Sequence, residues 1–165
     1  MPSTSRAFVK ASILYLIVGA ALGALLFANR WFPLEPRIAT LKVSHVQFLV
    51  VGWLTQFIIG VAWWLFPPLA IGLRDDSPLP ARRGQTQRGS EVLFWTALAC
   101  LNAGILLRAL FEPLQSWTKI SFFSVLAGVS GLFLLAATVL FVVNLWGRVR
   151  ELGKAKPGKG TEGRE

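Results

Sequence analysis

His45 is the only histidine of the chain, and it stands at the start of a long apolar segment that carries polar and small residues at helical spacing. In an α-helix each residue advances by about 100° around the axis, so residues seven or eleven positions apart return to one face. The residues that share the face of His45 are Gly52, Gln56, Gly60 and Trp63. Polar groups in hydrocarbon turn toward protein because an unpaired one is costly. We therefore expect this face to point into a helix bundle.

The imidazole of His45 has two candidate roles. A neutral imidazole is a common protein ligand for haem iron, and Gly52, two turns along the helix, would leave room for a flat ligand beside it. A single histidine near a membrane boundary is also a common interfacial hydrogen-bonding residue. The spacing of the residues leaves both interpretations open.

Long apolar blocks surround these residues and must position them. A bilayer core about 30 Å thick is crossed by roughly 20 helical residues, and each block is long enough to cross it. We predict an all-α membrane protein in which residues 1–150 form a single domain, an antiparallel bundle of four transmembrane helices. The predicted helices cover about 7–28, 41–66, 91–112 and 119–147. Short connections that contain proline favour antiparallel hairpins.

The basic residues indicate an orientation. The chain has a net charge of +9, and its Lys and Arg residues concentrate before the first span, in the loop from Pro67 to Ser90 and after the last span. The positive-inside rule then places both termini in the cytoplasm. We expect the basic tail at 151–165 to be disordered and to contact the anionic lipid bilayer rather than nucleic acid.

Few polar residues lie within the predicted spans. Gln56 and Asn102 fall near the middle of the membrane, where we expect them to hydrogen-bond across helices. No predicted span holds Asp or Glu in its interior, which disfavours a small multidrug antiporter. Metal-ligand clusters, nucleophile and base sets and phosphate-binding loops are absent from the sequence, so we predict no catalytic residue.

The segment HVQFLVVGWLTQFIIGVAWWLFP resembles the second transmembrane helix of the haem–copper oxidase catalytic subunit, closest to nitric oxide reductases and the related cbb3-type oxidases. The residues that carry the resemblance are His45, Gln47, Gly52, Trp53, Gly60, Trp63 or Trp64, and Pro67. In that family the histidine is an axial ligand of the low-spin haem b, near the outer face of the membrane. The resemblance therefore implies that His45 is a haem iron ligand in a bacterial cytoplasmic (inner) membrane. The orientation derived from charge places His45 on that same outer side.

The resemblance covers only the amino-terminal helices of a much longer subunit. The copper-site histidines and the ligand of the second haem have no counterpart here, so we expect no oxygen-reducing or nitric oxide-reducing centre. The resemblance implies a haem b-binding electron-transfer or haem-sensing subunit rather than an enzyme. The alternative is a haem-free structural or assembly subunit of a respiratory membrane complex. A sixth iron ligand would come from a homodimer or from another protein, or the position would stay open.

Arg108 is the other unusual residue, because it lies in the third predicted span about one turn from its outer end. Its guanidinium can pair with Glu112, four residues further on, or with Glu35 in the other outer loop. The resemblance implies a second role, since the family uses outer-side arginines to bind haem propionates. Arg108 is thus a candidate cofactor-binding residue together with His45 and Gly52.

Overall fold

The computed structural model describes residues 1–66, 69–70, 86–87 and 89–150. The predicted basic tail at 151–165 and most of the middle loop lie outside the described residues. What is described of that loop contains two-residue strands, β1 (Leu69–Ala70) and β2 (Thr86–Gln87), which pair antiparallel. Apart from this short ladder, the described part of the chain is helical, as the sequence predicts.

Four helical spans are found within the described residues, and each is long and apolar enough to cross a membrane. The first is α1 (Ser3–Trp31). The second, Pro36–Leu65, is continuous but changes character along its length. Its parts are η1 (Pro36–Leu41), α2 (Lys42–Gln47), η2 (Phe48–Thr55) and α3 (Gln56–Leu65). The third and fourth spans are α4 (Glu91–Thr118) and α5 (Ser121–Arg150).

The middle of the second span, η2, is a π-helix instead of the uniform α-helix assumed from the sequence. In a π-helix the carbonyl of residue i accepts a hydrogen bond from the N–H of residue i+5. The Thr55 hydroxyl has the same spacing, since it donates to the Val50 carbonyl at 2.9 Å. The wider turn changes the rotation between His45 and the residues that follow. The predicted face is nevertheless buried at Gly52 and at Gln56, Gly60 and Trp63.

Helix α4 continues past the point where the sequence predicts its end. Pro113 lies inside the helix, which ends at Thr118 and not at Glu112. Lys119 then adopts a left-handed conformation (φ 57°), and its N–H donates to the Gln115 carbonyl. This cap closes α4, and α5 begins two residues later at Ser121.

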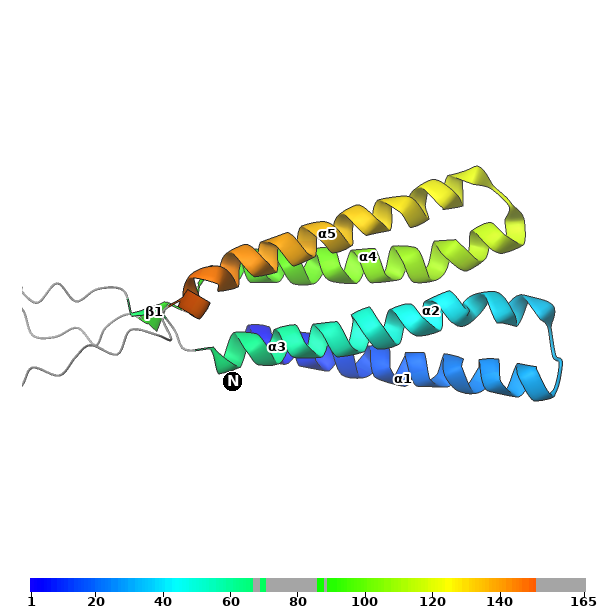
Figure 1. The fold of residues 1–165 in the computed structure, drawn as a ribbon, viewed down its shortest axis with the longest axis horizontal. Coiled ribbons are helices and arrows are strands. Elements are labelled where there is room, and N and C mark those ends of the chain that lie inside the picture. The colour runs from blue at the N-terminus through cyan, green and yellow to red at the C-terminus, as the bar shows by residue number, and fades with distance from the viewer. Residues whose placement is uncertain (67–68, 71–85, 88, 151–165) are drawn as a thin grey trace, which may run out of the picture.

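The spans pack as two hairpins (Figure 1). In the first hairpin α1 lies against the second span, and in the second hairpin α4 lies against α5. Glycines allow the close approach: a Cβ built at Gly60 would lie 2.8 Å from the Phe8 Cβ, and one at Gly104 would lie 2.7 Å from the Leu134 Cδ2. We call the end that holds the two connections between paired helices, residues 32–35 and 119–120, the loop end.

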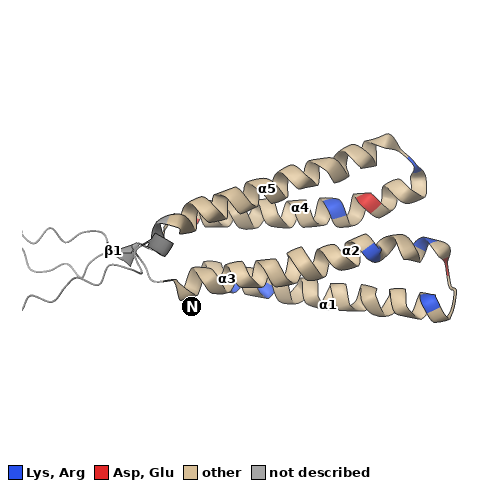
Figure 2. Ribbon diagram, in the orientation of Figure 1, with Lys and Arg blue, Asp and Glu red and all other residues tan. Residues whose placement is uncertain are grey.

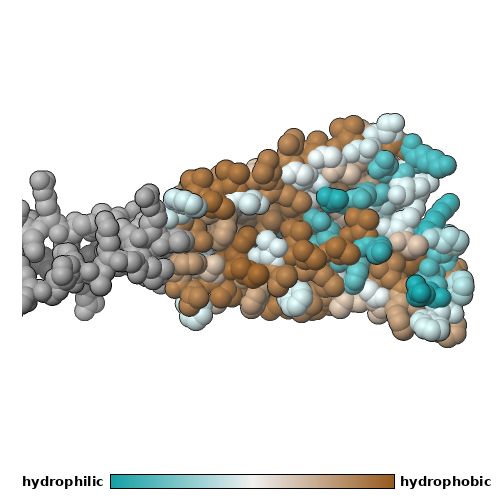
Figure 3. All heavy atoms as spheres, viewed as in Figure 1, coloured by the Kyte–Doolittle hydropathy of each residue, from teal (hydrophilic) through white to brown (hydrophobic). Residues whose placement is uncertain are grey.

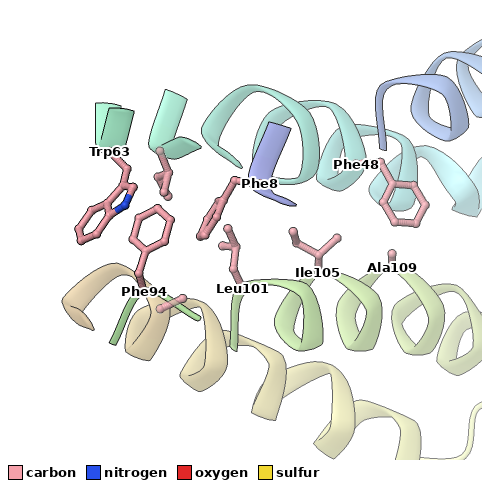
Figure 4. Close-up of a cluster of buried hydrophobic side chains, with 9 residues drawn as sticks. Phe8, Phe48, Trp63, Phe94, Leu101, Ile105 and Ala109 are labelled. Carbon is pink, nitrogen blue, oxygen red and sulfur yellow. The ribbon is translucent and has the colours of Figure 1, made fainter. Parts of the chain in front are cut away.

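An aromatic cluster joins the two hairpins at the end opposite the loop end (Figure 4). The Phe94 ring of α4 lies with its centroid 4.1 Å from that of Trp63 and 4.5 Å from that of Phe8. Phe141 of α5 is 6.3 Å from the same ring. One side chain of α4 thus contacts aromatic residues of α1, α3 and α5. Nearby, the Asn144 amide makes two hydrogen bonds of 2.9 Å to the backbone of Ser90.

The outer surface of the spans is apolar. Large hydrophobic side chains of α1 and α5 are widely exposed, and only 11% of the most apolar window of each helix is buried. Figure 3 shows this apolar surface along the spans, with hydrophilic residues gathered toward the loop end. Charged residues are likewise absent from the middle of every described span (Figure 2). Such a surface is suited to hydrocarbon rather than to water.

Candidate functional site

His45 lies in α2 near the loop end, and its ring is directed at α1. The Nδ1 atom is 2.8 Å from the Gly19 carbonyl oxygen. A carbonyl oxygen can only accept, so Nδ1 carries the proton and donates. In the neutral ring, Nε2 is then unprotonated and keeps its lone pair. The helix contact therefore selects the tautomer that can bind a metal ion through Nε2.

Gly23, one turn along α1 from Gly19, leaves space for the imidazole. A Cβ built at Gly23 would lie 2.6 Å from Cε1 of His45, which is closer than real Cβ contacts. Gly19 thus supplies the hydrogen-bond acceptor, and Gly23 supplies the room. The spacing of the two glycines indicates a small surface on one face of this helix, but the sequence does not show that this surface faces His45.

A pocket of about 430 Å³ opens beside His45 at the loop end of the first hairpin. Leu26 and Phe27 of α1 give it an apolar wall, while Arg30 and Lys42 bring positive charge. The other lining residues are Gly23, Asn29, Ala39 and His45. Arg30 and Lys42 could not be identified from the sequence, because their approach depends on how residues 32–41 turn the chain back.

Ser44, next to His45, holds α2 against α4. Its hydroxyl donates to the Ala109 carbonyl oxygen at 2.5 Å. That carbonyl lacks its usual helical donor because the residue four positions on is Pro113, which has no N–H. A side-chain hydroxyl from a neighbouring helix is a known way to satisfy such a group in a membrane. Ser44 therefore positions the helix that carries His45.

Gly52 lies further along the span, and the Tyr15 ring packs against it. A Cβ built at Gly52 would be 2.7 Å from the Tyr15 Cγ. Gly52 is not among the residues that line the His45 pocket. Because Tyr15 occupies the space beside Gly52, we do not include this glycine in the proposed site.

Tyr15 is also the hydrogen-bond partner of Asn102 in the middle of the spans. Its hydroxyl donates to Asn102 Oδ1 at 2.7 Å, and Asn102 Nδ2 donates to the Leu98 carbonyl. Asn102 thus hydrogen-bonds across helices, as predicted, but its partner is Tyr15 of α1 and not Gln56. The Gln56 side chain is fully buried, and its amide has no hydrogen-bond partner within the described residues.

Arg108 pairs with Glu112, one of the two partners considered from the sequence. Its Nε is 3.0 Å from Glu112 Oε2, and both side chains are partly exposed. Arg108 is not among the residues lining the pocket at His45. The two predicted site residues thus lie on neighbouring helices, α2 and α4, without sharing this pocket.

Comparison with known proteins gives no assignment: no family model, curated protein or solved structure matches this chain.

Proposed function

We propose that the chain is an integral membrane protein of a bacterial cytoplasmic membrane, with its spans arranged as an antiparallel bundle and both termini in the cytoplasm. The length and apolar character of the described spans support insertion in a membrane, and the resemblance of the second span supports a bacterial one. The concentration of Lys and Arg toward the termini and the middle loop supports the orientation. In this orientation the loop end lies on the outer side.

We further propose that the protein binds haem b through Nε2 of His45. The observation that carries the proposal is the hydrogen bond from Nδ1 to the Gly19 carbonyl. Histidines that bind metals commonly donate their other ring N–H to a backbone carbonyl or a carboxylate, which fixes the ring and raises the basicity of the ligating nitrogen. The resemblance of this segment to a haem-binding helix supports the same assignment.

The pocket beside His45 suits the chemistry of a haem. A haem has an apolar macrocycle and two carboxylates, and the pocket has an apolar wall and two basic side chains. When bound, the haem iron supplies one-electron transfer. His45 would hold the haem iron, and the apolar wall and basic side chains of the pocket would orient the cofactor. Because the sequence has a single histidine, a second iron ligand would come from another copy of the chain or from another protein, or that position would stay open.

A second candidate function is that of a haem-free structural or assembly subunit of a respiratory membrane complex. The hydrogen bond between His45 and Gly19 fits this function as well, because the bond ties α2 to α1 without any ligand. The exposed apolar faces of α1 and α5 would then pack against other membrane subunits.

A reduced-minus-oxidised absorbance spectrum separates the two functions. The protein is expressed with ample haem, purified in mild detergent and compared with His45→Asn, whose amide can still donate to Gly19 but cannot replace the imidazole as an iron ligand. We expect haem bands in the wild type and their loss in the variant, with similar thermal stability. No bands in the wild type would leave the structural role, and equal bands in both would refute His45 as the ligand.

A further inference from the structure

Two basic side chains at the mouth of the His45 pocket have no acidic partner among the described residues. Arg30 lies in the last turn of α1, and Lys42 is the first residue of α2. Other arginines at the loop end are paired: Arg37 Nε is 4.0 Å from a Glu35 oxygen, and Arg108 Nε is 3.0 Å from Glu112. Arg30 and Lys42 therefore concentrate uncompensated positive charge at one pocket.

Asn29, in the same pocket, adds a donor. Its Oδ1 accepts hydrogen bonds from the backbone N–H groups of Leu34 and Glu35, at 2.9 and 3.1 Å. These two bonds use the acceptor end of the amide and leave its NH₂ group as the end that can serve a ligand. Apart from His45, the polar side chains with capacity for a ligand at this mouth are thus donors and cations.

The apolar wall lies on the other side of the same pocket. Leu26 and Phe27 precede Arg30 along α1, so they lie deeper in the span than the basic residues. A ligand that fits has an apolar body within the span and acid groups at its end. Charge-assisted bonds from arginine or lysine are the usual protein contacts of carboxylates and phosphates.

We propose that Arg30 and Lys42 bind the acid groups of an amphipathic anion whose apolar body lies beside His45. This inference rests on the proposed function where it identifies the acid groups as the haem carboxylates. Arg30 and Lys42 then take the role that the resemblance implies for Arg108. The phosphate of an anionic phospholipid offers the same chemistry from a second source, and the experiment separates the two.

The first arm titrates porphyrins into protein held in phosphatidylcholine nanodiscs. The variants are Arg30→Gln and Lys42→Gln, with Lys119→Asn as the control, because it removes one positive charge from the α4–α5 connection. Haemin and iron-free protoporphyrin IX should each lose affinity about tenfold in the two test variants and less than about twofold in the control. The iron-free porphyrin makes this readout independent of the bond to His45.

Protoporphyrin dimethyl ester gives the sharpest comparison, because its acid groups are uncharged. We expect the ester to bind the wild type and both test variants equally. Equal losses for the acid and the ester, or no loss for either, would overturn the role of Arg30 and Lys42. A loss of acid binding in Arg108→Gln without one in the test variants would return that role to Arg108.

The second arm applies if haemin does not bind the wild type, which is the failure of the proposed function. Native mass spectrometry then counts phosphatidylglycerol molecules retained from nanodiscs that contain this lipid and phosphatidylcholine. Retention that falls several-fold in Arg30→Gln and Lys42→Gln, but not in Lys119→Asn, would support the anion site with lipid as its ligand. Equal retention in all the proteins would overturn the site itself.

Discussion

The Ser44 hydroxyl replaces a backbone hydrogen-bond donor that Pro113 removes from α4. Pro113 deprives the Ala109 carbonyl of its helical donor, and the Ser44 hydroxyl donates to that carbonyl from a different helix. The bond is buried, with Ser44 only 3% exposed. Because His45 is the next residue, the same bond helps to fix the height and rotation of the imidazole beside α1.

We predict that Ser44→Ala lowers the free energy of unfolding by about 2 kcal/mol, because it leaves the buried Ala109 carbonyl without a donor. Unfolding by sodium dodecyl sulfate in mixed micelles, followed by circular dichroism, measures the change. In a Pro113→Ala background the N–H of residue 113 is restored, so the same substitution should cost clearly less. Equal costs in both backgrounds would show that the hydroxyl does not serve the carbonyl freed by Pro113.

The helices themselves were largely predictable, whereas their contacts were not. Uninterrupted apolar runs mark the spans because any segment in hydrocarbon must satisfy its own backbone, and a helix does so. The π-helical segment at Phe48–Thr55, the continuation of α4 through Pro113 and the Tyr15–Asn102 bond all depend on the register between neighbouring helices. The residues of the His45 pocket escaped prediction for the same reason, since Arg30 and Lys42 meet only through a turn between helices.

Two glycines, one at a helix contact and one facing open space, allow a controlled test of helix packing. We predict that Gly60→Ala destabilises the first hairpin by roughly 1 to 3 kcal/mol, because the added Cβ would clash with Phe8. Gly131→Ala is the control: a Cβ there meets nothing within 4 Å, and alanine favours helix by up to about 1 kcal/mol. The same micelle titration measures both. A neutral Gly60→Ala would refute the close approach of α3 to α1.

In the described part of the molecule, contacts within each hairpin are more extensive than the contacts between the two hairpins. The aromatic cluster around Phe94 provides much of this contact at the end opposite the pocket (Figure 4). At the loop end the bond between Ser44 and Ala109 continues it, and the Trp117 indole N–H donates to the Thr40 hydroxyl at 2.8 Å. The pocket beside His45 belongs to the first hairpin, and these two bonds tie the η1 and α2 side of it to the second hairpin.

We predict that Phe94→Ala loosens the association of the hairpins and lowers the stability by roughly 3 kcal/mol, because the ring is fully buried among aromatic residues of other helices. Phe122→Ala on α5 is the control, since that side chain is 63% exposed and should change stability by less than about 1 kcal/mol. Similar losses in the two variants would contradict the role assigned to the cluster.

The central claim is that His45 binds haem iron, and the single histidine of the chain allows a direct test. Protein without a polyhistidine tag is labelled with nitrogen-15 in histidine only, so that the label marks one residue. Pulsed electron paramagnetic resonance of the ferric, haem-loaded protein then detects any nitrogen-15 nucleus bonded to the iron. We predict a strong nitrogen-15 hyperfine coupling, absent from the haem-loaded protein whose histidine carries nitrogen-14. A labelled, haem-loaded protein without that coupling would contradict the claim.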